Sequence, residues 1–182
     1  PDKSDVFFGI AVSHAITRSV RDSAALLDAT LGPEPSALFA PPAPAVAYEL
    51  CAQRDPPRLR IAVQRRPFNG AAVDPACLAA VEEAARLCEA MGHDVGDAAP
   101  DFSDLDWPAA LGLLSAAFTA DRIFAYAARA GIADPLARIE PGHAQSLRAQ
   151  MNRPAHELVA ALNVVRETER RYARYFETRD MI

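Results

Sequence analysis

Polar and apolar positions change their spacing along the chain, and each spacing predicts an element. Residues 59–63 alternate as in a half-buried strand. Asp74 and Pro75 match an N-cap followed by a first-turn proline, which predicts a helix ended by Gly92. Residues 93–95 predict a second short strand. A strand, a crossover helix and a strand form a βαβ unit, so we expect parallel pairing.

The second half of the chain has the periodicity of helices. Residues 108–131 and 154–178 each carry apolar positions at steps of three and four. In the second segment arginines alternate with glutamates at i,i+3 and i,i+4 spacing, which is typical of a solvated helix face. The expected apolar stripes are Leu113, Ala117, Ala120, Phe124 and Ala127 in the first segment, and Leu158, Leu162, Val165, Tyr172 and Phe176 in the second.

The first part of the chain is more irregular. Residues 5–16 are apolar but too short and glycine-interrupted for a long helix, so a buried strand or a tightly packed loop is expected. Ser19 is a candidate N-cap for a helix that Gly32 ends, with Asp22 at the acidic position of a capping box. Residues 33–57 are rich in proline, which predicts an extended surface connector.

These elements predict an α/β fold with a helix-rich C-terminal half. Two or three strands leave a sheet edge and much helix surface uncovered, so we expect the chain to be part of a larger sheet. Along the chain, the predicted segments are residues 1–32, 33–57, 58–100 and 101–182.

Composition narrows the classes of function. The formal net charge is −5 and there is no basic stripe, so a nucleic-acid partner is not expected. No apolar run approaches the roughly 20 residues that span a bilayer, and the first residues lack a signal-peptide pattern, so no membrane partner is expected. Three cysteines without a C-x-x-C pair predict a reducing, cytoplasmic location. Cys77 and Cys88 fit an apolar helix face and are expected to be buried.

The usual catalytic motifs are missing from the sequence. It contains no G-x-G-x-x-G, Walker A or G-x-S-x-G string. The histidines show no metal-ligand spacing; we expect His14 to be partly buried and His93 to interact with the last carbonyls of the helix before it. Asp101, Asp104 and Asp106 fit a loop that leads to a helix N-terminus.

One pair in the first long helix stands out. Asp121 and Arg122, beside Phe118, either face a pocket or form a solvent-exposed pair, and the sequence leaves both readings open. Lys3 is the only lysine, so a lysine base would have to be Lys3 or lie elsewhere. Spacing alone therefore assigns no reaction.

Several strings in a fixed order resemble the amidase signature family of hydrolases. Residues 14–28, HAITRSVRDSAALLD, are similar to the segment after the catalytic core of that family. The later strings LRIAV, VDP, EEAARL and GHDV follow in the family's order up to Pro100. Residues 179–182 lie where the family continues into a strand. The resemblance implies a partial amidase domain over residues 1–182, within a mixed sheet flanked by helices.

The resemblance also implies a reaction and residue roles. Members of the family cleave carboxamides with a Ser–cis-Ser–Lys triad and need no cofactor. That triad lies in a Gly/Ser-rich signature that this sequence lacks, so no residue here is expected to be catalytic. Arg18, Arg21 and Asp22 match polar positions of the motif and are expected to brace its helix against the catalytic region. Phe118 and Arg122 are candidates for the wall of the substrate pocket.

The implied partners are a small-molecule amide and a second copy of the protein, and no metal. Two other hypotheses remain at this point. One is a non-catalytic α/β binding or assembly module derived from the same fold. The other is a helical interaction protein that uses residues 108–178.

Overall fold

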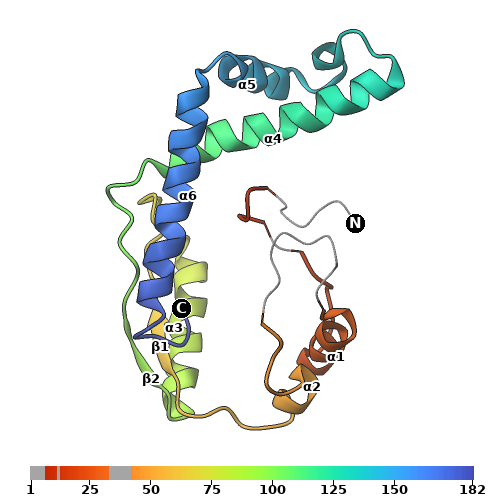
Figure 1. The fold of residues 1–182 in the computed structure, drawn as a ribbon. Helices are drawn as coiled ribbons and strands as arrows, with labels where there is room; N and C mark the ends of the chain where they lie inside the picture. Colours follow the sequence, from red (N-terminus) through yellow and green to blue (C-terminus); the bar gives the residue numbers. More distant parts are fainter. Residues whose placement is uncertain (1–6, 12, 33–41) are drawn as a thin grey trace. The chain divides into compact units, whose positions relative to one another are not determined.

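The computed structural model describes residues 7–11, 13–32 and 42–182 (Figure 1). The chain divides into two compact units, residues 1–57 and residues 58–182. Among the described residues, the regular elements of the first unit are helices, and the second unit contains helices and a parallel sheet. The predicted α/β class and the helix-rich C-terminal half are confirmed.

Helix α1 (Val20–Thr30) begins where the sequence predicts. The Ser19 side chain accepts a hydrogen bond from the Asp22 backbone N–H at 3.1 Å, which satisfies one of the free donors of the first turn. Of the apolar positions on this helix Ala24 is buried, whereas Val20 is 78% exposed. Much of the apolar surface of α1 is therefore uncovered among the described residues.

The proline-rich connector contains one helical turn, α2 (Tyr48–Cys51). Both carboxylate oxygens of Asp28 accept backbone hydrogen bonds, from Tyr48 at 2.9 Å and from Glu49 at 2.9 Å. These contacts supply acceptors that the N-terminus of such a short helix would otherwise lack. The prediction of an extended connector is therefore wrong at α2, and residues 33–41 lie outside the described part.

The start of the chain forms a turn rather than a strand in its described residues. The Ile10 N–H donates to the Phe7 carbonyl at 3.0 Å, and Phe7 and Phe8 both have φ of 55°. Such left-handed backbone interrupts an extended strand. Ile16 is fully exposed, at 103%, so the expected tight packing is wrong there. Residues 5, 6 and 12 lie outside the described residues.

The second unit opens with the predicted βαβ unit. Strands β1 (Arg60–Val63) and β2 (Asp94–Asp97) pair in parallel, with Ile61 opposite Val95. Helix α3 (Pro75–Ala90) connects them. Its N-cap is Asp74, whose carboxylate accepts from the Ala76 N–H at 2.8 Å. The parallel pairing and the helix start are confirmed.

The C-terminal residues add a third position to this sheet. Met181 forms a parallel bridge with Ile61, and its carbonyl accepts from the Ala62 N–H at 3.0 Å. The Asp180 carboxylate binds the Arg60 guanidinium through contacts of 2.7 and 3.1 Å. Strand β1 therefore lies between β2 and an isolated bridge at Met181.

Helix α3 packs with Ala85 buried and Cys88 half-buried. Cys77, in its first turn, is exposed, so the expected burial of that thiol is wrong. Cys77 instead lines an open hollow of about 210 Å³ between the end of β1 and the start of α3, together with Gln64 and Pro67. The first turn of the helix thus lies over a hollow rather than over the core.

Four helical segments follow β2: α4 (Trp107–Ala130), the 3₁₀ helix η1 (Pro135–Arg138), α5 (Pro141–Met151) and α6 (Ala155–Tyr175). Helix α4 packs against both α5 and α6 (Figure 1). The predicted helices at 108–131 and 154–178 are confirmed within a few residues. A buried cluster closes the contact between α4, η1 and α5: Ala116, Ala120, Leu136, Ala144 and Leu147.

Candidate functional site

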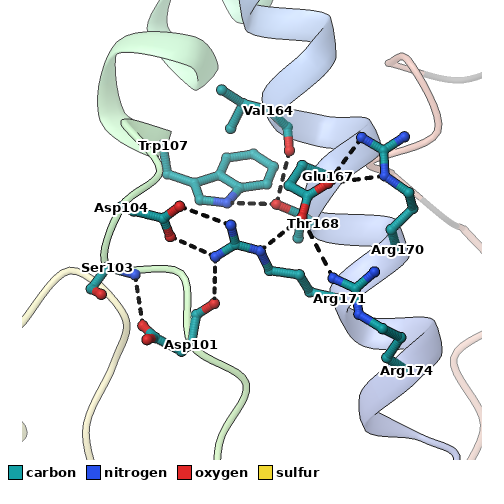
Figure 2. Close-up of polar contacts among 10 residues, drawn as sticks. All are labelled: Asp101, Ser103, Asp104, Trp107, Val164, Glu167, Thr168, Arg170, Arg171 and Arg174. Atoms are coloured by element: carbon teal, nitrogen blue, oxygen red, sulfur yellow. Dashed lines mark hydrogen bonds and ion pairs between the residues drawn. The ribbon is translucent and has the colours of Figure 1, made fainter.

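The most extensive polar network joins the loop before α4 to the middle of α6 (Figure 2). Arg171 lies at its centre. Its guanidinium donates to both carboxylate oxygens of Asp104, at 2.5 and 2.8 Å, and to the Asp101 carbonyl at 2.8 Å. It also donates to the Glu167 carboxylate at 3.0 Å. The predicted pairing along α6 is confirmed, and Arg171 additionally reaches a second element.

These contacts hold the acidic groups in their ionised form. The hydrogen bond from Arg171 lowers the pKa of Asp104 to about 2. Hydrogen bonds from Arg171 and Arg170 lower the pKa of Glu167 as well. A general acid near neutral pH needs a raised pKa, so neither carboxylate is suited to donate a proton. The network fits an ion-pair clamp between two elements.

An indole and a hydroxyl extend the clamp. The Trp107 Nε1–H donates to the Thr168 hydroxyl at 3.0 Å, and that hydroxyl donates to the Val164 carbonyl at 2.9 Å (Figure 2). Thr168 is buried. Asp106 caps α4 by accepting from the Ala109 N–H at 3.1 Å, as its place in the sequence predicts. The three aspartates before α4 therefore serve the helix start and its contact with α6.

A hollow of about 300 Å³ lies between the end of α4 and the segment around η1. We call it the Arg122 hollow. It is lined by apolar and cationic residues together with one tyrosine, and no carboxylate is among them. Its lining comprises Arg122, Ile123, Tyr126, Ala127, Ile132, Pro135, Arg138 and Ile139.

Of the candidate residues on α4, Arg122 lines this hollow and Phe118 lies next to it. The Arg122 guanidinium carbon lies 5.3 Å from the centre of the Phe118 ring, which is a cation–π contact. Asp121 is exposed and does not line the hollow. Arg122 therefore lines a hollow that Asp121 does not, and a role for Arg122 in a substrate pocket stays a prediction.

Sequence reasoning missed Arg138 and Tyr126, which complete the hollow. Arg138 belongs to η1, and the signal for that short helix is present in the sequence. Asp134 precedes Pro135, and its carboxylate accepts from the Ala137 N–H at 3.2 Å. An aspartate cap followed by proline is the pattern that predicted the start of α3.

The residues of the motif Arg18, Arg21 and Asp22 lie at the start of α1, and all three are exposed. Asp22 contributes its backbone N–H to the Ser19 cap. Bracing by the two arginines is not tested by these contacts and stays a prediction.

The histidines differ from expectation in both cases. His14 is exposed rather than partly buried, and its Nε2 lies 3.3 Å from the Thr30 hydroxyl. His93 accepts a hydrogen bond at Nδ1 from the Leu59 N–H, at 3.2 Å, so it links the starts of β1 and β2. A ring that accepts from the neighbouring strand is turned toward the sheet rather than toward the carbonyls that end α3.

In the described part of the chain, no three His, Cys, Asp or Glu side chains converge in an arrangement that could hold a metal ion. None of the helices described combines the length and apolar character required to cross a bilayer.

Comparison with known proteins assigns a family to these features. The family model described as Amidase matches residues 7–182. The 6-aminohexanoate-cyclic-dimer hydrolase of Pseudomonas sp. (strain NK87) is 40% identical over 99 residues, which are 54% of this chain and 20% of that protein. The protein of the same name from Paenarthrobacter ureafaciens gives the same identity and coverage.

The fold comparison agrees. A solved structure of 6-aminohexanoate cyclic dimer hydrolase superposes with a TM-score of 0.79 at 27% identity. The match covers 89% of this chain and 34% of that one. The chain therefore spans about one third of its structural relative.

Proposed function

This chain belongs to the amidase family, and from that membership we propose that it is a section of a hydrolase that cleaves carboxamide C–N bonds by serine acyl transfer. The observation that carries the proposal is the family match over residues 7–182. The similarity in fold to a cyclic-amide hydrolase over 89% of the chain supports it.

Serine acyl transfer in this family requires a lysine base and two serines in a Gly/Ser-rich signature, and this sequence has no such signature. In serine acyl transfer a deprotonated serine attacks the amide carbonyl, the amine leaves with a proton, and water then hydrolyses the acyl ester. The sequence holds one lysine, Lys3, and no Gly/Ser-rich signature. We therefore place the lysine base and both serines in another part of the complete protein. No cofactor takes part in this reaction.

The described residues fit a supporting role in that enzyme. The clamp around Arg171 holds the start of α4 on α6, and α4 in turn carries Phe118 and Arg122. A helix fixed at its first turn presents its side chains at a defined place. We propose that Phe118 and Arg122 contribute to the substrate side of the enzyme, which acts on a small-molecule amide and forms a homodimer.

Assays of two proteins test the proposal. The complete protein is expected to release amine from simple linear or cyclic amides, measured with an amine-reactive dye. The purified chain of residues 1–182 is expected to release none. The matched control is the complete protein with its Gly/Ser-rich serines changed to alanine. Turnover by residues 1–182 alone, or undiminished turnover by the serine variant, would contradict the proposal.

A non-catalytic binding module is the competing function. It keeps the fold but needs neither the lysine nor the serines. A complete protein without a lysine and a Gly/Ser-rich signature, and without amide turnover, would favour that module over the hydrolase.

A further inference from the structure

The Arg122 hollow combines an apolar interior with positive charge. Ile123, Ile132 and Ile139 contribute aliphatic surface, and Arg122 and Arg138 contribute guanidinium groups. At about 300 Å³ the hollow is at the small end of the range for ligand pockets. An apolar cavity with a few converging polar groups is the usual form of a small-molecule site.

The guanidinium N–H groups of Arg122 and Arg138 have no acceptor among the described residues. Within residues 7–11, 13–32 and 42–182, neither Arg122 nor Arg138 forms a hydrogen bond or an ion pair. Arg60 and Arg171, by contrast, each bind a carboxylate. The cation–π contact of Arg122 with Phe118 uses the charge of the guanidinium but leaves its N–H donors free.

Two guanidinium groups that have no hydrogen-bond partner among the described residues, and that line an apolar hollow, match one class of ligand. We propose that the Arg122 hollow binds a small organic acid, with its hydrocarbon part in the hollow and its carboxylate at Arg122 and Arg138. Guanidinium groups present paired N–H donors that suit a carboxylate. The hydrocarbon part gains from leaving water, and the lining holds no acidic side chain that would repel the anion.

The source of such an acid rests on the proposed function. Hydrolysis of an amide breaks the C–N bond, adds water, and yields a carboxylic acid and an amine. The acid in the hollow is then either a released product or the free carboxylate end of a linear amide substrate. Both sources share an alkyl chain and a carboxylate.

Binding is measured on the complete protein by titration calorimetry, with hexanoate as the probe and hexanamide as its neutral counterpart. Arg138→Gln and Arg122→Gln are each expected to weaken hexanoate binding by about three- to tenfold, the range for a partly exposed contact to a charged group. The affinity of the parent protein for hexanamide should be no higher than the affinity of these variants for hexanoate. Arg129→Gln, an exposed arginine of α4 outside the hollow, is the matched control and should bind hexanoate normally.

Equal binding of hexanoate and hexanamide, absence of binding, or unchanged affinity in both Arg122→Gln and Arg138→Gln overturns the inference. Arg138→Gln tests the loss of one guanidinium group without removing the contact between Arg122 and Phe118. If amide hydrolysis persists while hexanoate fails to bind, this inference alone is wrong. If hexanoate binds to a protein that hydrolyses no amide, the proposed function is wrong and the acid site stands.

Two kinetic measurements identify the source of the acid. A KM that is lower for a linear amide with a free carboxylate than for its methyl ester, and that loses this difference in Arg138→Gln, supports a substrate carboxylate. Inhibition by hexanoate without such a difference in KM supports a product acid.

Discussion

The ionised carboxylate of Asp104 makes the contact between α6 and the loop before α4 depend on pH. The pKa of Asp104 is about 2 in the folded chain because of its hydrogen bond to Arg171, against an ordinary value of 3.8. The folded state therefore binds this proton less readily than the unfolded state. The stabilisation from Asp104 is complete above about pH 4 and is lost as the pH falls through about 2.

Replacing that carboxylate should remove this part of the acid sensitivity. In Asp104→Asn, the free energy of unfolding should fall less steeply between about pH 4 and pH 2 than in the parent chain. Urea unfolding at several pH values, followed by tryptophan fluorescence, measures the slope. Asp121→Asn is the control, since Asp121 is exposed and lies outside the clamp. The same slope in Asp104→Asn and in the parent would rule out the clamp as the cause.

Contacts between residues close in the sequence could be predicted from it, whereas contacts between distant residues could not. The caps at Ser19 and Asp74 lie within three residues of the N–H groups that they accept from, so local pattern was enough to predict them. For Asp106, the sequence predicted only a loop that leads to a helix N-terminus. Asp104 and Arg171 are 67 positions apart, and their contact depends on how α6 folds back on the chain. A single sequence gives no local signal for such a pair.

One glycine lies inside helix α4 and another follows its last residue, and the two have opposite roles. Gly131 ends the helix with φ of 68°, a conformation that an L side chain adopts only with strain. Gly112 lies inside the helix, where an added Cβ would meet only the Gln150 side chain, at 4.0 Å. The same substitution should therefore change stability in opposite directions at the two ends of one element.

Gly131→Ala should lower the free energy of unfolding by about 1 kcal/mol, whereas Gly112→Ala should raise it by roughly 0.5–1 kcal/mol. Each variant is the control for the other, since both replace one hydrogen with a methyl group. Thermal unfolding followed by circular dichroism gives the two signs. A loss of stability in Gly112→Ala would show that the space beside Gln150 is tighter than the structure has it.

Among the helices, those with a strong apolar periodicity were predicted from the sequence, and one with a weak periodicity was not. Helices α4 and α6 carry long apolar stripes and were predicted. Helix α5 buries only Ala144 and Leu147, and its other positions mix polar residues with proline, glycine, alanine and methionine, so its sequence shows little apolar stripe. The Arg122 hollow depends on the turn from α4 into η1, and Arg122 is the only residue of its lining that was a candidate from the sequence.

The larger second unit is closed by a contact between its two ends. Arg60 at the start of β1 binds Asp180 near the C-terminus, and this contact holds Met181 beside β1. The hydrogen bonds of Arg60 also lower the pKa of Asp180 to about 2. The third position of the sheet therefore depends on one ion pair and a few backbone hydrogen bonds.

Asp180→Ala should detach that third position without separating β1 from β2. Hydrogen exchange should become faster at the Ala62 N–H, which donates to the Met181 carbonyl. It should change little at the Asp94 N–H, which donates to the Leu59 carbonyl on the other side of β1. Mass spectrometry with peptide-level resolution separates the two sites, and Asp121→Ala is the control. Unchanged exchange at Ala62 would show that Met181 pairs with β1 independently of Asp180.

The position of Met181 beside Ile61 also bears on the order of events during synthesis. Strands β1 and β2 and helix α3 are complete once Asp97 has left the ribosome. The partner for the other edge of β1 is translated more than 80 residues later, a delay of several seconds at roughly 5–20 residues per second. During that interval the edge of β1 is open to pairing with another nascent chain. The helices from α4 to α6 are made in the same interval, so their early folding would shorten the distance over which Met181 must return to β1.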